Sequence, residues 1–177
     1  MQFDWLILNG IQNNLRGEFL DTVMPIITHL GDGGIIWIIL GAVLLLFAKT
    51  RRLGVLILLS LAIEALCCNV ILKPLVDRAR PFSVFPLEQL LIEAPLDPSF
   101  PSGHTGAAFA VVAALYFNGN KYWLPAAILA AIISFSRMYL YVHYPSDVLV
   151  GFLLGIMAGF AGKKLVSAWE KRKAKAK

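Results

Sequence analysis

Charged residues and cysteines are both scarce in this chain of 177 residues. Asp, Glu, Lys and Arg make up only 15% of it, whereas 58% is hydrophobic. A soluble domain of this size needs more polar surface than that to cover its core, so we expect lipid to replace water around much of the chain. The same composition excludes a disordered chain, a coiled coil and a disulfide scaffold.

The two cysteines, Cys67 and Cys68, are neighbours inside an apolar run. Adjacent residues on a helix point in different directions, so we interpret them as packing residues rather than as a disulfide or metal ligands. The N-terminus lacks the basic residues that open a signal peptide and has Asp4 instead. We therefore expect it to remain on the mature protein.

Long apolar runs dominate the rest of the chain. About 20 apolar residues are needed to cross the hydrocarbon of a bilayer. Five segments are candidates, at residues 33–48, 53–72, 103–119, 122–141 and 147–166. Short basic or turn-forming stretches separate the first from the second and the third from the fourth, which predicts two antiparallel hairpins. The predicted fold is an all-α integral membrane bundle with about five transmembrane helices.

Three regions are predicted from these runs. Residues 1–32 are apolar in part but too short to span, so we expect interfacial helices there, with a sixth span across residues 17–31 as the alternative. Residues 33–166 form the transmembrane domain. Residues 167–177 form a basic tail, which is typical of a cytoplasmic anchor touching anionic lipid and not of a nucleic-acid-binding arm.

Basic residues predict the orientation. Most of the 16 Lys and Arg residues lie at one set of span ends, namely Lys49, Arg51, Arg52, Lys121, Lys163, Lys164, Lys171, Arg172, Lys173, Lys175 and Lys177. By the positive-inside rule these ends face the cytoplasm, so the C-terminus is cytoplasmic. The long loop of residues 81–101 then lies outside, and loops of that length in a small domain are usually functional.

Three further cations gather at the outer span ends. Lys73, Arg80 and Arg137 would repel one another in a partly desolvated cleft unless an anion with several charges joined them. A phosphate group fits, because Arg matches its oxygens bidentately and Lys adds a point charge. Ser102 and Gly103 stand where the third span begins, so their backbone N–H groups are candidate donors to the same anion.

Two histidines supply what phosphoryl transfer still needs. His143 and Asp147 are four residues apart, a spacing that lets the carboxylate fix the imidazole tautomer and raise its nucleophilicity. His104 is the candidate general acid for the leaving oxygen. The cations would carry most of the rate, because phosphoryl transfer depends chiefly on positioning and charge.

Three stretches of the sequence carry a resemblance to a known family. KPLVDRARP at residues 73–81, PSGH at residues 101–104 and SRMYLYVHYPSD at residues 136–147 resemble the three signature motifs of the type 2 phosphatidic acid phosphatase (PAP2) superfamily. All defining positions are present, in the family order.

The resemblance implies a helical bundle with its site at the outer membrane face, no metal or other cofactor, and a phosphohistidine intermediate. His143 would be the nucleophile, Asp147 its orienting partner and His104 the general acid. The residues that would hold the phosphoryl group are Lys73, Arg80, Ser102, Gly103 and Arg137.

Small bacterial members that this chain resembles often act on undecaprenyl diphosphate, phosphatidylglycerophosphate or related lipids such as phosphatidic acid. The expected partners are therefore a lipid phosphate and membrane lipids, in the bacterial inner membrane, with the oligomeric state left open. A lipid phosphotransferase is the main alternative. A vanadium-dependent haloperoxidase is disfavoured by the membrane spans, and a non-catalytic transporter or scaffold would be expected to lose His104 or His143.

Some polar residues are interpreted as structural. Glu64 lies nine residues before Lys73, about 13 Å along a helix, which is too far for contact with a bound phosphate. Asp77 and Arg78 are expected to pair only with each other. His29 is assigned no catalytic role, and an aromatic belt at the membrane surface is expected to include Tyr139, Tyr141 and Tyr144.

Overall fold

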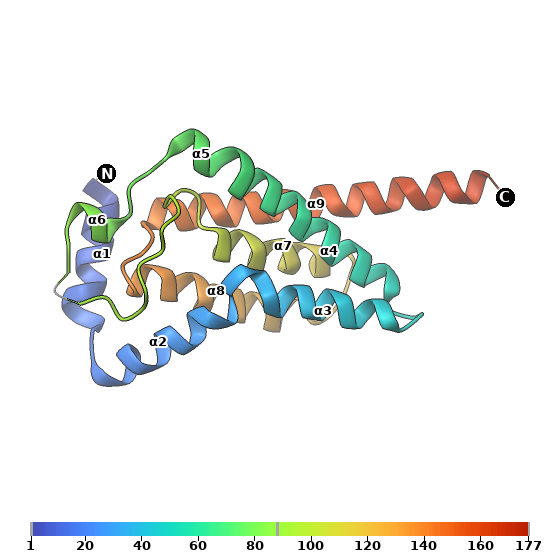
Figure 1. The fold of residues 1–177 in the computed structure, drawn as a ribbon. Coiled ribbons are helices and arrows are strands. Elements are labelled where there is room, and N and C mark those ends of the chain that lie inside the picture. The colour runs from blue at the N-terminus through green and yellow to red at the C-terminus, as the bar shows by residue number, and fades with distance from the viewer. Residues whose placement is uncertain (1, 88, 177) are drawn as a thin grey trace.

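The computed structural model describes residues 2–87 and 89–176, and these contain helices but no strand. Figure 1 shows the helices packed largely along one long axis. In chain order they are α1 (Gln2–Leu15), α2 (Glu18–Leu30), α3 (Ile35–Leu46), α4 (Arg51–Ala65), α5 (Lys73–Val76), α6 (Pro81–Val84), α7 (Gly103–Phe117), α8 (Trp123–Tyr139) and α9 (Pro145–Lys175). A π-helical segment, Leu66–Leu72, joins α4 to α5.

Among the described residues, three stretches are long and apolar enough to cross a membrane. They are Glu18–Leu46 with 29 residues, Arg51–Val84 with 34 and Pro145–Lys175 with 31. The shorter helices α7 and α8 are apolar as well. The predicted all-α membrane bundle is confirmed.

The first of these stretches differs from the segment expected at residues 33–48. Helix α3 has 12 residues, about 18 Å of length, against about 30 Å of hydrocarbon. A 3₁₀ turn at Asp32–Gly34 joins it to α2, with Gly33 and Gly34 at φ 57° and 70°, a backbone conformation that favours glycine. The boundary expected after residue 32 falls in this turn, and α2 and α3 follow each other along one side of the bundle (Figure 1).

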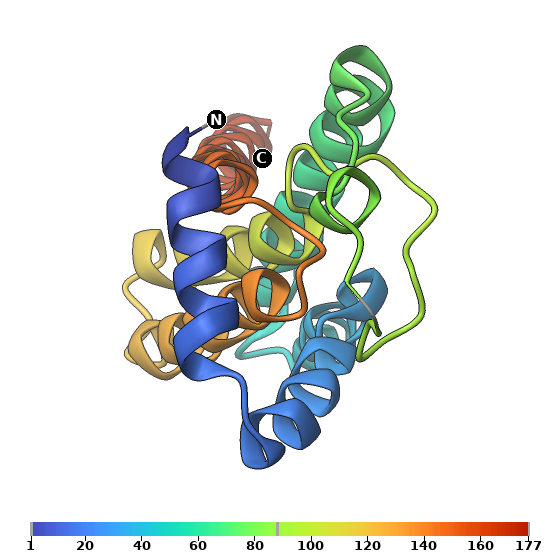
Figure 2. The same ribbon diagram turned by 90° about the vertical axis from the view of Figure 1, so that its left-hand side faces the viewer.

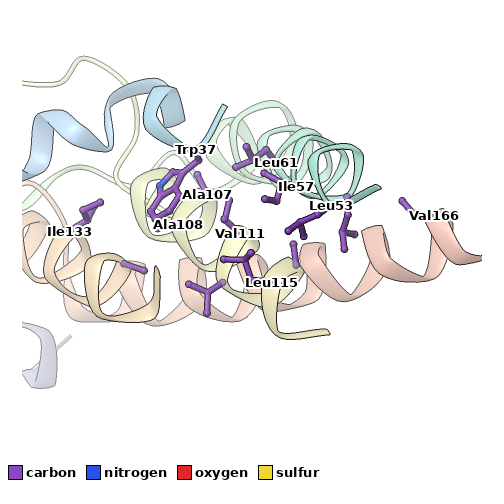
Figure 3. Packing of buried hydrophobic residues seen from close by; sticks show 14 residues of the cluster. Trp37, Leu53, Ile57, Leu61, Ala107, Ala108, Val111, Leu115, Ile133 and Val166 are labelled. Carbon is purple, nitrogen blue, oxygen red and sulfur yellow. The ribbon is translucent and has the colours of Figure 1, made fainter. Parts of the chain in front are cut away.

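Helix α7 lies at the centre of the bundle, against α4, α8 and α9. Figure 3 shows Ala107, Val111 and Leu115 of α7 facing Ile57 and Leu61 of α4. Helices α7 and α9 lie close together because glycines of α9, namely Gly151, Gly155 and Gly159, face α7. A Cβ atom added at Gly155 would lie 2.5 Å from the carbonyl oxygen of Gly106, so only glycine lets the two backbones meet there.

Helix α1 lies across the ends of α8 and α9 (Figure 2). It covers the segment between those two helices, so that Tyr139, Tyr141 and Tyr144 are buried, with exposures of 0%, 3% and 4%. Trp5 of α1 packs edge-on against Tyr144. The expectation of a membrane-surface belt for these three tyrosines was therefore wrong, because α1 covers them.

The opposite end of the molecule is formed by α9 alone. This helix continues without a break through residue 166 to Lys175 and extends beyond the other helices (Figure 1). The basic residues expected in a tail thus belong to the last turns of a long helix, where cations also compensate the helix dipole.

Candidate active site

One cavity of about 950 Å³ brings together most of the residues that the sequence singles out. It is lined by residues from the start of α5, the segment before α6, the start of α7, the end of α8 and the segment before α9. Those of the predicted site are Lys73, Arg80, Gly103, His104, Arg137 and His143. Ser102 and Asp147 are fully buried behind this wall.

Local structure explains how Lys73 and Arg80 reach the same place. Lys73 follows the π-helical segment and begins α5, and Asp77 ends that helix with a left-handed backbone at φ 44°. Arg80 stands before Pro81 and is extended, as the residue before a proline prefers. The chain therefore turns back after α5 and places Arg80 beside the cavity, with 4% of its surface exposed.

Arg80 is held by main-chain carbonyls as well as by charge. Its Nε donates to the carbonyl oxygen of Asp97 at 2.8 Å, and Nη1 donates to that of Val142 at 2.7 Å. The third cation, Arg137, is 3% exposed and donates from Nη1 to the hydroxyl of Thr28. Its buried Nε has no hydrogen-bond partner among the described residues. Arg137 thus has donor capacity left for an anion in the cavity.

Asp97 is one of the site residues that the sequence does not reveal. Its carboxylate forms ion pairs with Lys73 and, through Oδ1 at 2.9 Å, with Arg80 Nη2. Burial by itself would raise the pKa of Asp97, but the two cations outweigh that effect and lower it to about 2. An oxyanion of the chain therefore lies between two of the cations expected to hold phosphate. In the sequence, Asp97 was only one acid of a long loop.

His143 faces the cavity as a buried imidazole with 1% exposure. Its Nε2 lies 3.3 Å from Arg80 Nη1, and because a guanidinium only donates, Nε2 must accept. The ring hydrogen is then on Nδ1, which lies 3.5 Å from Asp147 Oδ2. Burial lowers the pKa of His143 well below its usual value, and the charges of Arg137 and Arg80 lower it further. The result is a neutral imidazole.

Asp147 is oriented by donors on both oxygens. Oδ2 accepts from the hydroxyl of Ser99 at 2.5 Å and from the N–H of Tyr144 at 2.9 Å. Oδ1 accepts from Arg78 Nη1 at 2.5 Å, and Arg78 Nη2 donates to Asp4 of α1 at 2.8 Å. The expectation that Arg78 pairs only with Asp77 was wrong, because the turn after α5 directs Arg78 toward α9 instead.

His104 contacts a residue from the turn between α2 and α3. Its Nε2 lies 2.9 Å from Asp32 Oδ1, and Asp32 Oδ2 lies 2.7 Å from His29 Nδ1. Neither partner carried a catalytic signal in the sequence, since both are distant from His104 along the chain. Both line the same cavity as His104, and His29 contacts Asp32 there.

Ser102 differs from what the sequence predicts, because its backbone N–H already has a partner, whereas Gly103 lines the cavity. The N–H of Ser102 donates to the carbonyl oxygen of Asp147 at 3.1 Å, and its hydroxyl lies 3.1 Å from that of Thr105. Gly103 lines the cavity directly, and a Cβ atom there would lie 3.9 Å from Lys73 Nζ. A side-chain carbon at that distance would make an ordinary contact, so crowding alone does not require glycine here.

Glu64 also lines this cavity and is 2% exposed. It packs against Gly106, where a Cβ atom would overlap its carboxyl group. Beyond it the wall is apolar and is formed by Ile38, Leu58, Leu61, Ala62, Ala65 and Ala107. The cavity therefore changes from cationic to apolar along its length. Within residues 2–87 and 89–176, no three His, Cys, Asp or Glu side chains are grouped in a way that could hold a metal ion.

Comparison with known proteins agrees with this geometry. The PAP2 superfamily model matches residues 53–171. An undecaprenyl-diphosphatase of Sulfolobus acidocaldarius is 34% identical over 75% of this chain and 64% of its own length. Phosphatidylglycerophosphatase B of Bacillus subtilis is 33% identical over 84% of this chain and 76% of its own length. The chain therefore spans slightly less than two thirds of the first relative.

A solved structure is similar over almost the whole chain. The crystal structure of a transmembrane phosphatidylglycerolphosphate phosphatase of PAP2 type from Bacillus subtilis superposes with a TM-score of 0.74 and 29% identity. The superposition covers 97% of this chain and 86% of that one. With the three motifs gathered around one cavity in an apolar helical bundle, we conclude that the chain is a membrane-embedded member of the PAP2 superfamily.

Proposed function

We propose that this protein is a lipid phosphatase that hydrolyses a phosphomonoester or diphosphate of a membrane lipid through a phosphohistidine intermediate. The observation that carries the proposal is the shared cavity, in which His143 and His104 face the same space as the cations Lys73, Arg80 and Arg137. Such a group can bind a phosphoryl anion, attack it and protonate its leaving group.

In the first half of the reaction, His143 Nε2 attacks phosphorus. The bond from phosphorus to the leaving oxygen breaks with its electron pair on that oxygen, and His104 donates a proton to it. Asp147, held by Ser99 and Arg78, orients Nδ1–H of His143 and stabilises the charge that develops on the ring. The donors are fixed before the reaction, so little reorganisation is needed.

In the second half, a water molecule attacks the phosphorus of the phosphohistidine. His104 now accepts the proton of the water, and the phosphorus–nitrogen bond breaks with its electron pair returning to His143. Inorganic phosphate then leaves. Lys73, Arg80 and Arg137 stabilise the equatorial oxygens in both steps, with the N–H of Gly103 as a further donor. Ser102 would contribute by fixing the start of α7. Its hydroxyl could also donate to the phosphoryl group if it gives up its hydrogen bond with the hydroxyl of Thr105.

The apolar part of the cavity suits a lipid tail. Ile38 of α3 and Leu58 of α4 belong to its wall, so the chain of the lipid would lie against α3 and α4 while its head reaches the cations. We place the site at the extracytoplasmic face of the inner membrane and the end of α9 in the cytoplasm, as the distribution of basic residues indicates. Residues 33–166 would form the catalytic domain, with α1 and α2 as N-terminal additions.

We propose undecaprenyl diphosphate and phosphatidylglycerophosphate as the first substrates to test, because relatives carry these activities in their names. Purified protein in detergent would be assayed for phosphate release from both, from phosphatidic acid and from a soluble phosphomonoester, in excess EDTA. We expect rapid release from one lipid.

The control is His143→Ala, which removes the nucleophile and is expected to abolish release while the protein still unfolds in a cooperative thermal transition. Acid-labile, base-stable phosphate on the wild-type protein would identify the intermediate. Release that persists in His143→Ala, or that requires an added divalent ion, would contradict the mechanism. Phosphate appearing on an added acceptor lipid in place of water would identify a phosphotransferase instead.

A further inference from the structure

Asp32 connects the candidate general acid to the surface of the molecule. Its Oδ1 lies 2.9 Å from His104 Nε2, and its Oδ2 lies 2.7 Å from His29 Nδ1. The side chain of His104 is 18% exposed, that of Asp32 is 48% exposed and that of His29 is 63% exposed. All three groups line the cavity, and their exposure increases from His104 through Asp32 to His29.

We propose that Asp32 is a positioning residue that fixes the tautomer and orientation of His104, and that His29 in turn holds Asp32. The inference rests on the proposed function, in which His104 exchanges a proton with the leaving group. It adds a residue from outside the region that the superfamily model matches, since residue 32 precedes residue 53.

The contact determines which nitrogen of His104 does the chemistry. A carboxylate only accepts hydrogen bonds, so Asp32 requires a hydrogen on Nε2 of His104. Nδ1 then remains to exchange a proton with substrate. Gly31 supports this orientation, because a Cβ atom there would lie 2.7 Å from Cδ2 of the His104 ring. The Cδ2 edge thus faces the turn between α2 and α3, and the Nδ1 edge is turned away from it.

The proton balance over the cycle follows from this arrangement. When the bond from phosphorus to the leaving oxygen breaks, the proton on Nδ1 of the imidazolium passes to that oxygen, and the ring becomes neutral with Nε2–H still donated to Asp32. In the second half, Nδ1 takes a proton from the attacking water as the oxygen of that water bonds to phosphorus. The ring is then charged again.

Charge gives Asp32 a second effect. Burial opposes a protonated His104 ring, and so do the positive charges of Arg137 and Lys73, which line the same cavity. Asp32 supplies a negative charge at hydrogen-bond distance from Nε2 of that ring. Asp32 thereby favours the charged form that must donate, and His29 keeps the carboxylate from turning away.

The test compares substrates whose leaving groups differ in their need for a proton. A lipid phosphomonoester expels a strongly basic lipid alkoxide and a lipid diphosphate expels a lipid phosphate, so both use the acid, most of all the monoester. An aryl phosphate with a weakly basic leaving group does not need it. We expect Asp32→Ala to lower kcat on the lipid about tenfold or more and to change phosphorylation by the aryl phosphate by less than about twofold. His104→Ala should show the same split with a larger loss on the lipid.

The double variant gives the sharper result. If Asp32 acts through His104, Asp32→Ala with His104→Ala loses no more activity than His104→Ala alone. Asp32→Asn keeps an acceptor oxygen and is expected to recover part of the loss. Asp21→Asn is the matched control, because this acid of α2 pairs with Arg16 away from the cavity.

Several outcomes would overturn the proposal. The role of Asp32 is rejected if Asp32→Ala loses equal activity on both substrates, if the losses multiply in the double variant, or if Asp32→Ala keeps wild-type rates. Each of these results would leave the phosphatase activity established. Absence of phosphate release from the wild-type protein on every substrate would instead reject the proposed function, and with it this role for Asp32.

Discussion

Asp97 and Arg80 make a two-part contact at the mouth of the cationic site. Arg80 Nη2 lies 2.9 Å from Asp97 Oδ1, and Arg80 Nε donates to the Asp97 carbonyl oxygen at 2.8 Å. Lys73 pairs with the other carboxylate oxygen. The pKa of Asp97 is about 2, because the two cations outweigh the effect of burial, which would raise it. The carboxylate therefore stays charged at any ordinary working pH. A phosphoryl group that binds Lys73 and Arg80 must compete with it.

Replacing Asp97 should therefore strengthen the binding of phosphate-like anions. For Asp97→Asn we expect the inhibition constant of vanadate, which resembles phosphate at its transition state, to fall about fivefold. This corresponds to about 1 kcal/mol, the upper range for a pair that is partly exposed to solvent. The measurement is vanadate inhibition of phosphate release at low ionic strength.

The matched control for this experiment is Glu93→Gln. Glu93 lines the same cavity from the same loop, and within the described part of the chain it forms no ion pair. It should leave the inhibition constant unchanged. Weaker vanadate binding in Asp97→Asn would show that the carboxylate supports the anion site and does not compete for it.

Arg78 is expected to affect catalysis without touching substrate. It donates to Asp147 at 2.5 Å and to Asp4 at 2.8 Å, so it links α1 to the carboxylate behind His143. Arg78→Gln should lower kcat about 10- to 100-fold with little change in KM, because Asp147 keeps Ser99 and the Tyr144 N–H but loses its charged partner. Steady-state kinetics on the lipid substrate would measure this.

Arg16→Gln serves as the comparison for Arg78, since Arg16 pairs with Asp21 away from the cavity. If Arg78→Gln raised KM with kcat unchanged, Arg78 would bind substrate instead. Asp4→Asn should give a smaller loss of kcat, because the direct contact between Arg78 and Asp147 remains.

Residue spacing predicted that the candidate site residues would lie around one cavity, because they stand at the ends of apolar helices. Once five such helices are packed side by side, Lys73, His104 and Arg137 must meet at one end of the bundle. The same reasoning could not find Asp97 or Asp32. Each belongs to a connection whose path depends on packing between distant segments, and neither has a sequence neighbour that marks it.

The errors also have physical reasons. From the sequence alone, Tyr139, Tyr141 and Tyr144 resemble interfacial aromatics, but packing against α1 and its neighbours buries them. Arg78 was assigned to its neighbour Asp77 because the left-handed turn at that residue is not visible in the sequence. Local pattern thus predicts helices well, whereas contacts of loops depend on the finished packing.

Gly155 should be critical for stability. A Cβ atom at this position would lie 2.5 Å from the Gly106 oxygen and 2.8 Å from the Ala110 nitrogen, which are backbone atoms of α7 that cannot turn aside. Gly155→Ala is expected to lower the free energy of unfolding by about 1–3 kcal/mol, as overpacking does. Thermal unfolding in detergent would record a lower Tm.

Gly10→Ala is the control for that substitution, since nothing lies within 4 Å of a Cβ atom at Gly10 in α1. Alanine favours a helix over glycine, so this variant should match or exceed the wild-type Tm. An unchanged Tm in Gly155→Ala would mean that α7 and α9 can separate at little cost.

His143 should remain neutral well below the pH at which a free imidazole takes up a proton. Burial and the charges of Arg137 and Arg80 lower its pKa from the usual 6.5. Between these two pKa values the unfolded chain binds a proton at His143 and the folded protein does not. The stability contributed by the neutral His143 is therefore lost as pH falls from 6.5 toward the pKa of the folded protein. For activity the sign is the opposite, because the neutral nucleophile stays available under mildly acidic conditions.

The measurement is an NMR titration of the histidine signals, with His143→Ala to assign the signal of His143. Free imidazole in the same sample serves as the reference. We expect His143 to be uncharged at the pH at which the reference is half-protonated. Titration together with the reference would contradict both the burial of this ring and the influence of the two arginines on it.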